Sequence, residues 1–108
     1  MRQPPKPLDA SVVADTIPSR FFSQAQAHPD TPAYHSRRGG AWQSASWRDY
    51  AGHVRKASRA LIALGLQPGQ GVCLLGYNRP EWVIGAFAAI AAGGVPAGIY
   101  TTCSPVEV

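Results

Sequence analysis

The side chains most able to bind metals or relay protons are spread along this sequence without a shared pattern. The histidines are His28, His35 and His53, and the predicted elements place them at a helix end, on a strand and on a helix. Such spacings support neither a metal site nor a nucleophile relay. The two cysteines, Cys73 and Cys103, have no His or Cys at ligand spacing, so neither a zinc site nor a disulfide framework is expected.

Carboxylates and tryptophans have structural explanations. Three acidic residues fall in the predicted first turns of helices, where negative charge complements the helix dipole, so no acid and base pair is inferred. These are Asp49, Glu81 and Glu107. Tryptophans can stack on nucleic acid bases, but each lies in or beside a predicted element, and packing in the core is the favoured interpretation. These are Trp42, Trp47 and Trp82.

Phosphate-binding loops are absent from the sequence. There is no glycine-rich loop followed by Lys, no Gly-x-Gly-x-x-Gly after a strand and no Gly-x-Ser-x-Gly elbow. The hydroxyl-rich residues 101–104 (TTCS) lack the glycines and the Lys that a phosphate loop needs, so a loop with a helix cap is favoured over ligand contact. The residues therefore predict no catalytic, no cofactor-binding and no metal-binding side chain.

Size and charge narrow the class of protein. A chain of 108 residues is one domain at most. Its formal net charge is +4, but the basic residues lie in a Pro-rich leader, beside a Gly-Gly turn and along one predicted helix. A solvated helix face explains this distribution better than a phosphate-binding patch, so no nucleic acid partner is expected.

Local signals predict a helix, a hairpin and a second helix. Thr16 caps a helix that Pro29 ends, with Ile17, Phe21, Phe22 and Ala25 at helical spacing. Two short strands, residues 33–36 and 41–44, flank Arg-Arg-Gly-Gly and predict a hairpin. Residues 46–49 (SWRD) resemble a capping box, and Gly65 offers a left-handed end to the helix that follows. The apolar face of that helix comprises Tyr50, Val54, Ala57, Leu61 and Leu64.

The second half of the chain reads as strand, helix, strand. The apolar run of residues 72–75 (VCLL) predicts a strand buried on both faces, with Cys73 as a small buried side chain. Asn78 is expected to cap a helix with Pro80 in its first turn and an apolar ridge, and Gly93-Gly94 ends it before a second buried strand over residues 95–100. The ridge is Val83, Ile84, Phe87 and Ile90. This order predicts parallel pairing and an α/β fold.

Residues 82–100 carry no charge and are close to the length of a membrane span. Gly93, Gly94 and Pro96 interrupt them, so a buried helix followed by a strand is favoured, while a membrane-anchored peptide stays a third, weaker alternative. Residues 1–15 read as a flexible, Pro-rich leader without a secretory signal. We expect a cytoplasmic protein, with peripheral membrane association of its parent left open.

The end of the sequence resembles the start of a helix. Residues 104–107 (SPVE) combine a cap, Pro at the first position and Glu at the third, yet only Val108 follows. Two buried parallel strands also need neighbouring strands and cover. We therefore expect residues 16–108 to be an incomplete N-terminal portion of a larger domain.

Residues 75–82 (LGYNRPEW), 91–94 (AAGG) and 98–102 (GIYTT) resemble adenylate-forming acyl-CoA synthetases. The last of these stretches is most similar to the long-chain and very-long-chain fatty acid branch, including the bubblegum type. The resemblance covers roughly residues 16–108, and it implies the N-terminal portion of the large α/β domain of such an enzyme.

The resemblance implies a parent enzyme that converts a fatty acid, ATP and CoA to acyl-CoA through an acyl-adenylate, with Mg²⁺. The family's phosphate loop and catalytic lysine have no counterpart in these 108 residues. We therefore expect the chain alone to bind none of these cofactors and to be inactive. A self-sufficient α/β binding or interaction module without catalysis is the alternative.

Overall fold

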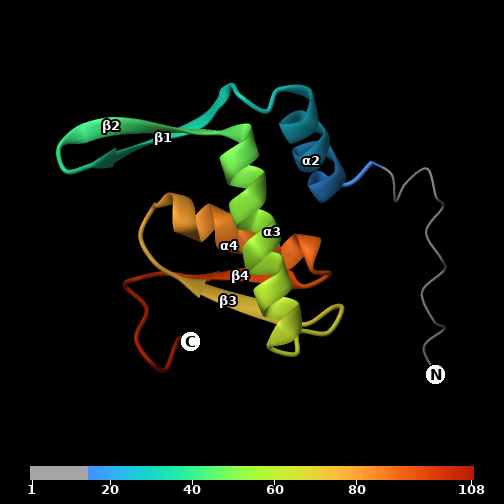
Figure 1. Ribbon diagram of the computed structural model, residues 1–108. Coiled ribbons are helices and arrows are strands. Elements are labelled where there is room, and N and C mark those ends of the chain that lie inside the picture. The colour runs from blue at the N-terminus through green and yellow to red at the C-terminus, as the bar shows by residue number, and fades with distance from the viewer. Residues whose placement is uncertain (1–14) are drawn as a thin grey trace.

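The computed structural model describes residues 15–108, so the predicted leader lies outside the described residues except for its last residue. Figure 1 shows the elements as they follow one another. They are α2 (Ile17–Ala27), β1 (Pro32–Arg38), β2 (Ala41–Ser46), α3 (Trp47–Ala63), β3 (Gly71–Leu75), α4 (Pro80–Ala91) and β4 (Val95–Ile99). The second half of the chain has the predicted order of strand, helix and strand, and its two strands pair in parallel, which confirms the α/β class.

Helix α2 begins with a reciprocal capping box. The Ser19 backbone N–H donates to Thr16 Oγ1 at 3.3 Å, and the Thr16 N–H donates to Ser19 Oγ at 2.9 Å. Two of the amide donors that every helix start leaves unpaired are thereby satisfied. The cap at Thr16 is confirmed, while its partner Ser19 was not anticipated.

Strands β1 and β2 form the predicted antiparallel hairpin, with Arg38 opposite Ala41. The turn consists of Gly39 and Gly40, whose φ angles are 58° and 80°. Both residues adopt the left-handed region that the favoured two-residue hairpin turn requires. Arg37 and Arg38, which the sequence placed in the turn, belong to β1.

Helix α3 starts and ends where the sequence predicts. Ser46 Oγ accepts the Asp49 backbone N–H at 3.1 Å. At the other end Gly65 has φ 100°, and the Leu66 N–H donates to the Leu61 carbonyl at 3.0 Å, which is the Schellman arrangement. Leu64, expected on the buried face, is 85% exposed. That expectation was wrong because the buried residues of α3 all lie within its first twelve residues, up to Ser58.

Strands β3 and β4, which precede and follow α4 in the sequence, pair in parallel, with Gly71 opposite Val95 and Leu75 opposite Ile99. Pro80 occupies the first turn of α4, as predicted, but the N-cap is Arg79 and not Asn78. Arg79 makes no side-chain cap bond. The cap prediction was one residue early because proline itself sets the first helical position here.

The prediction that both strands are buried on both faces was wrong. Residues of β3 alternate in exposure, and Cys73 is exposed together with Gly71 and Leu75. In β4, Val95 is also exposed. The reason is that α4 packs on one face of this two-stranded sheet, while no described element covers the other face.

The core lies where three helices meet. Helix α4 packs on β3 and β4, α3 packs on α4, and α2 packs against α3 (Figure 1). The Phe21 ring lies 4.8 Å from Tyr50 and 5.0 Å from Phe87, measured between centroids. On α4 the fully buried residues are Ala88 and Ala89, while Val83 of the predicted ridge is exposed. Small side chains there let α4 fit between α3 and the sheet.

Residues 104–107 form a turn with half of a capping box. The Ser104 N–H donates to Glu107 Oε2 at 2.6 Å, and the Glu107 N–H donates to the Ser104 carbonyl at 3.0 Å. The Glu107 side chain therefore reaches back to Ser104 as at a helix start, but residues 105–107 form a turn and not a helix. Within residues 15–108 no helix is long and apolar enough to cross a membrane, and the uncharged residues 82–100 are divided between α4 and β4.

Candidate functional site

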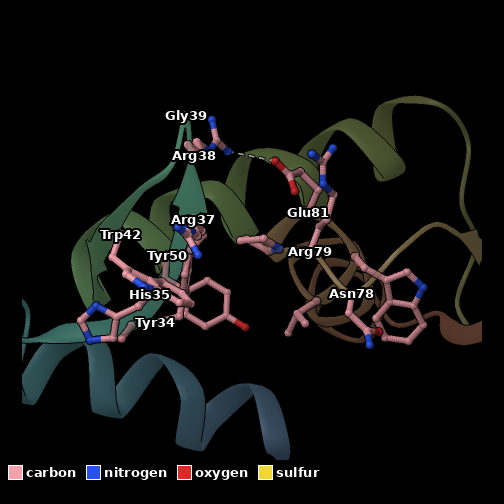
Figure 2. Close-up of a pocket in the computed structure, with 15 residues that line it drawn as sticks. Tyr34, His35, Arg37, Arg38, Gly39, Trp42, Tyr50, Asn78, Arg79 and Glu81 are labelled. Atoms are coloured by element: carbon pink, nitrogen blue, oxygen red, sulfur yellow. Dashed lines mark hydrogen bonds and ion pairs between the residues drawn. The ribbon is translucent and has the colours of Figure 1, made fainter.

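A groove of about 1120 Å³ opens between the β1–β2 hairpin and the start of α4. Figure 2 shows its lining side chains, which come from the hairpin, from Tyr50 of α3 and from residues 78–83 at the start of α4. Aromatic and basic side chains dominate the lining. They are Tyr34, Trp42, Tyr50 and Trp82, with Arg37, Arg38 and Arg79.

One ion pair spans the groove. Arg38 Nη2 lies 3.1 Å from Glu81 Oε1 and ties the hairpin to the first turn of α4 (Figure 2). Both side chains are mostly exposed, so the pair contributes at most about 1 kcal/mol to stability. Arg37 and Arg79 line the same groove and have neither an ion pair nor a side-chain hydrogen bond to any described residue. The groove therefore holds two unpaired positive charges.

Two tyrosines lie at the inner side of this groove. Tyr34 and Tyr50 pack edge to face, with ring centroids 5.1 Å apart. Burial raises the pKa of Tyr34, and the nearby Glu81 carboxylate raises it further. Burial raises the pKa of Tyr50 to about 12, with a smaller contribution from Tyr34. Both hydroxyls are therefore protonated at neutral pH, and neither is suited to act as a base.

A smaller hollow of about 390 Å³ lies where β3 and β4 end. Its lining includes Tyr77, Trp82 and Thr101. The Trp82 indole lies so close to Gly98 that a Cβ there would be 3.2 Å from Cζ2, which explains the glycine. Parallel strands present their carboxyl ends to ligands in many α/β proteins. From the hydroxyl-rich residues 101–104, only Thr101 is among the residues that line this hollow. The segment begins with a turn, as expected.

The side chains considered from the sequence do not assemble into a catalytic centre. No group of three His, Cys, Asp or Glu residues that could hold a metal occurs among residues 15–108. His35 lines the groove, whereas His28 and His53 lie elsewhere. Trp47 packs against Phe21 as predicted, but Trp42 is 70% exposed.

The prediction for Trp42 was wrong because its side chain lines the open groove, where no described element covers it. Sequence reasoning missed the groove itself. The one available signal was the occurrence of arginines together with aromatic residues in two short segments, residues 37–42 and 77–82.

A comparison with family profiles decides the relationship of this chain. The profile described as AMP-binding enzyme matches residues 21–108. The chain belongs to the AMP-binding enzyme family. Among curated members, the long-chain-fatty-acid–CoA ligase ACSBG2 of Rattus norvegicus is 44% identical over 89 residues, covering 82% of this chain and 13% of that ligase. The human ligase ACSBG1 is 34% identical over 90 residues, covering 83% and 12%.

Solved structures agree with this family fold. The N-terminal subdomain of Klebsiella oxytoca NpsA superposes with a TM-score of 0.73 at 20% identity, covering 82% of this chain and 22% of that chain. The fatty acid AMP ligase of Legionella pneumophila gives 0.76 at 16% identity, covering 91% and 17%. The resemblance to the bubblegum branch of AMP-binding enzymes is thus confirmed, and the chain spans about an eighth of the length of its curated relatives.

Proposed function

We propose that residues 16–108 act as the scaffold portion of a long-chain fatty acid–CoA ligase. The observation that carries this proposal is the family match over residues 21–108, together with 33–44% identity to relatives that are named long-chain-fatty-acid–CoA ligases. The exposed outer face of the β3–β4 sheet supports it, because parallel sheets are stable when both faces are covered.

The proposed reaction of the parent has two steps. A fatty acid carboxylate attacks the α-phosphorus of ATP, forming an acyl-adenylate and releasing pyrophosphate. The CoA thiolate then attacks the acyl carbonyl, forming the thioester and releasing AMP. Charge that develops on the phosphates requires a metal ion and donors aimed at the phosphate oxygens.

The described residues do not provide a binding site suited to Mg²⁺ or to a nucleoside triphosphate. They include no cluster of metal-ligating side chains and no glycine-rich loop that could surround phosphates. We therefore propose that ATP, Mg²⁺ and CoA are held by other parts of the parent, and that this chain contributes packing and no catalytic residue. We propose that the partners of the parent are these small molecules and not nucleic acid. We also propose that the parent acts in the cytoplasm.

Pyrophosphate exchange tests the inactivity of the chain alone. The purified chain is incubated with a long-chain fatty acid, ATP, Mg²⁺ and labelled pyrophosphate, beside a complete fatty acid–CoA ligase as a positive control. We expect exchange in the control and none above background with the chain. Exchange that depends on both the chain and the fatty acid would show that the chain holds catalytic groups.

One observation favours the alternative of a self-sufficient binding or interaction module. Helices α2, α3 and α4 share a closely packed aromatic cluster built on Phe21, Tyr50 and Phe87. A thermal melt with a hydrophobic dye separates the two proposals. A scaffold portion gives a broad transition with dye binding before melting, whereas a self-sufficient module gives a sharp transition without it.

A further inference from the structure

One edge of the β1–β2 hairpin has no strand beside it among residues 15–108. The hairpin is a sheet of two strands, so β1 pairs with β2 alone. Residues 33–38 of β1 all line the groove, whereas β2 contributes only Trp42. The groove therefore runs along the free edge of β1, and such an edge presents a row of unpaired backbone N–H and C=O groups.

The register of the hairpin identifies the backbone groups at that edge. Arg38 and Ala41 flank the two-residue turn, and a pair in this position is hydrogen-bonded. Hydrogen-bonded and non-hydrogen-bonded pairs alternate along an antiparallel ladder. His35 and Arg37 fall in pairs of the second kind, so their N–H and C=O groups point away from β2. Neither backbone has a partner outside the hairpin in the described part of the chain.

Positive charge lies on both sides of this edge. Figure 2 shows Arg37 on the hairpin and Arg79 at the start of α4, on the two walls of the groove. Both are exposed, and neither has an ion pair or a side-chain hydrogen bond to a residue that the structure describes. The acidic residue in the lining, Glu81, is already paired with Arg38. The groove therefore complements carboxylates.

We propose that this groove binds an extended, acidic peptide segment of a partner protein, which adds to β1 as a third strand. Backbone hydrogen bonds to His35 and Arg37 supply affinity in this mode of recognition, and alternate side chains supply specificity. Because the side chains of a strand point to opposite faces in turn, apolar residues of the peptide pack on Tyr34 and Tyr50 while carboxylates reach the arginines. The proposal does not depend on the proposed ligase activity, because it involves no reacting group.

Nucleic acid fits the groove less well than a peptide does. The phosphate backbone of a nucleic acid accepts hydrogen bonds and donates none, whereas the edge of β1 offers both donors and acceptors. The Glu81 carboxylate in the lining also repels phosphate. A peptide backbone satisfies both kinds of group at the edge, so it is the favoured ligand.

Fluorescence anisotropy tests the proposal with the whole chain. The probe is a fluorescein-labelled peptide, TEVEEVT, which has the length of β1 and carries carboxylates on both faces. We expect binding that weakens as salt is raised and little binding of the peptide with Gln in place of Glu. Two further peptides carry N-methyl groups on one edge or the other, and only the form methylated on the edge facing β1 should lose binding.

Two double variants separate the groove from net charge. An exposed contact between an arginine and a carboxylate contributes up to about fivefold to affinity. Arg37→Gln/Arg79→Gln should therefore bind the probe about 5- to 25-fold more weakly. The matched control Lys56→Gln/Arg59→Gln removes the same charge from α3, outside the groove, and should keep most of the binding.

Hydrogen exchange of the β1 amides tests the added strand itself. Bound probe should slow exchange at His35 and Arg37 and leave Ser36 unchanged, because the Ser36 N–H already faces β2. Equal losses in the two variants, equal binding of both methylated peptides, or no protection at His35 and Arg37 would each overturn the proposal. Displacement of the probe by free glutamate or by a single-stranded oligonucleotide would also overturn it. Far-UV circular dichroism establishes that each variant is folded before binding is compared.

Discussion

Replacing two glycines by alanine should change the stability of this chain in opposite directions. At Gly94, a Cβ would lie 3.0 Å from the Gln70 carbonyl oxygen, 3.1 Å from Leu66 Cδ2 and 3.3 Å from the Ala89 carbonyl oxygen. Both carbonyls already accept hydrogen bonds of 2.8 Å, from Val95 and from Gly94 itself. Relief of the clash must strain these bonds, and overpacking of this kind costs about 1–3 kcal/mol.

Gly52→Ala is the matched control. Gly52 lies inside α3, and a Cβ there would meet nothing within 4 Å. Alanine is favoured over glycine in a helix interior by about 0.5–1 kcal/mol. The same added methyl group therefore stabilises the chain at Gly52 and destabilises it at Gly94.

Urea denaturation followed by far-UV circular dichroism measures both effects. With a urea dependence of about 1 kcal/mol per M for a small chain, Gly94→Ala should lower the midpoint by about 1–3 M, and Gly52→Ala should raise it by about 0.5–1 M. Midpoints are compared directly because a broad transition is expected. An unchanged midpoint for Gly94→Ala would refute the packing described between α4, β4 and the loop before β3.

Three further predictions concern single side chains. Because the pKa of Tyr50 rises from about 10 in the unfolded chain to about 12 when folded, the contribution of Tyr50 to stability should be constant below pH 10 and fall by up to about 1.4 kcal/mol per pH unit between pH 10 and 12, as pH-dependent unfolding would show. A Tyr50→Phe variant that keeps the full decline would contradict this. Cys73 is exposed and should react with a thiol reagent faster than the half-buried Cys103 in the native chain, so equal rates would contradict the one-sided sheet. Arg38→Ala should cost less than about 1 kcal/mol, and a larger loss in urea denaturation would show that its ion pair with Glu81 is not a simple surface contact.

Local signals predicted most of the secondary structure. The caps at Thr16 and Ser46, the glycine pair at the hairpin turn and the left-handed Gly65 all depend on hydrogen bonds between residues within a few positions of each other. Such signals can be recognised in a sequence because each one depends on a residue type that lets nearby backbone N–H or C=O groups form hydrogen bonds at the end of an element.

Errors arose where burial depends on other elements. Cys73 and Leu64 are apolar in character but exposed, because no described element packs against them. The groove was not predicted because it brings Arg38 beside Glu81, 43 residues later in the chain. No periodicity within a segment can indicate such a contact. The sequence also predicts that this chain has no catalytic residue, and this stays a prediction.

A segment exchange tests the proposed scaffold role most directly. The aligned segment of the rat ligase ACSBG2, which is 44% identical over 89 residues, is replaced by the corresponding residues of this chain, and acyl-CoA formation from a long-chain fatty acid is measured. We predict a rate within about tenfold of the unmodified ligase, equivalent to about 1.4 kcal/mol of transition-state stabilisation. The same exchange carrying Val54→Asp, which places a charge in the core, should be inactive. A chimera that folds but forms no acyl-CoA would contradict the proposal that this chain supplies the scaffold of a fatty acid–CoA ligase.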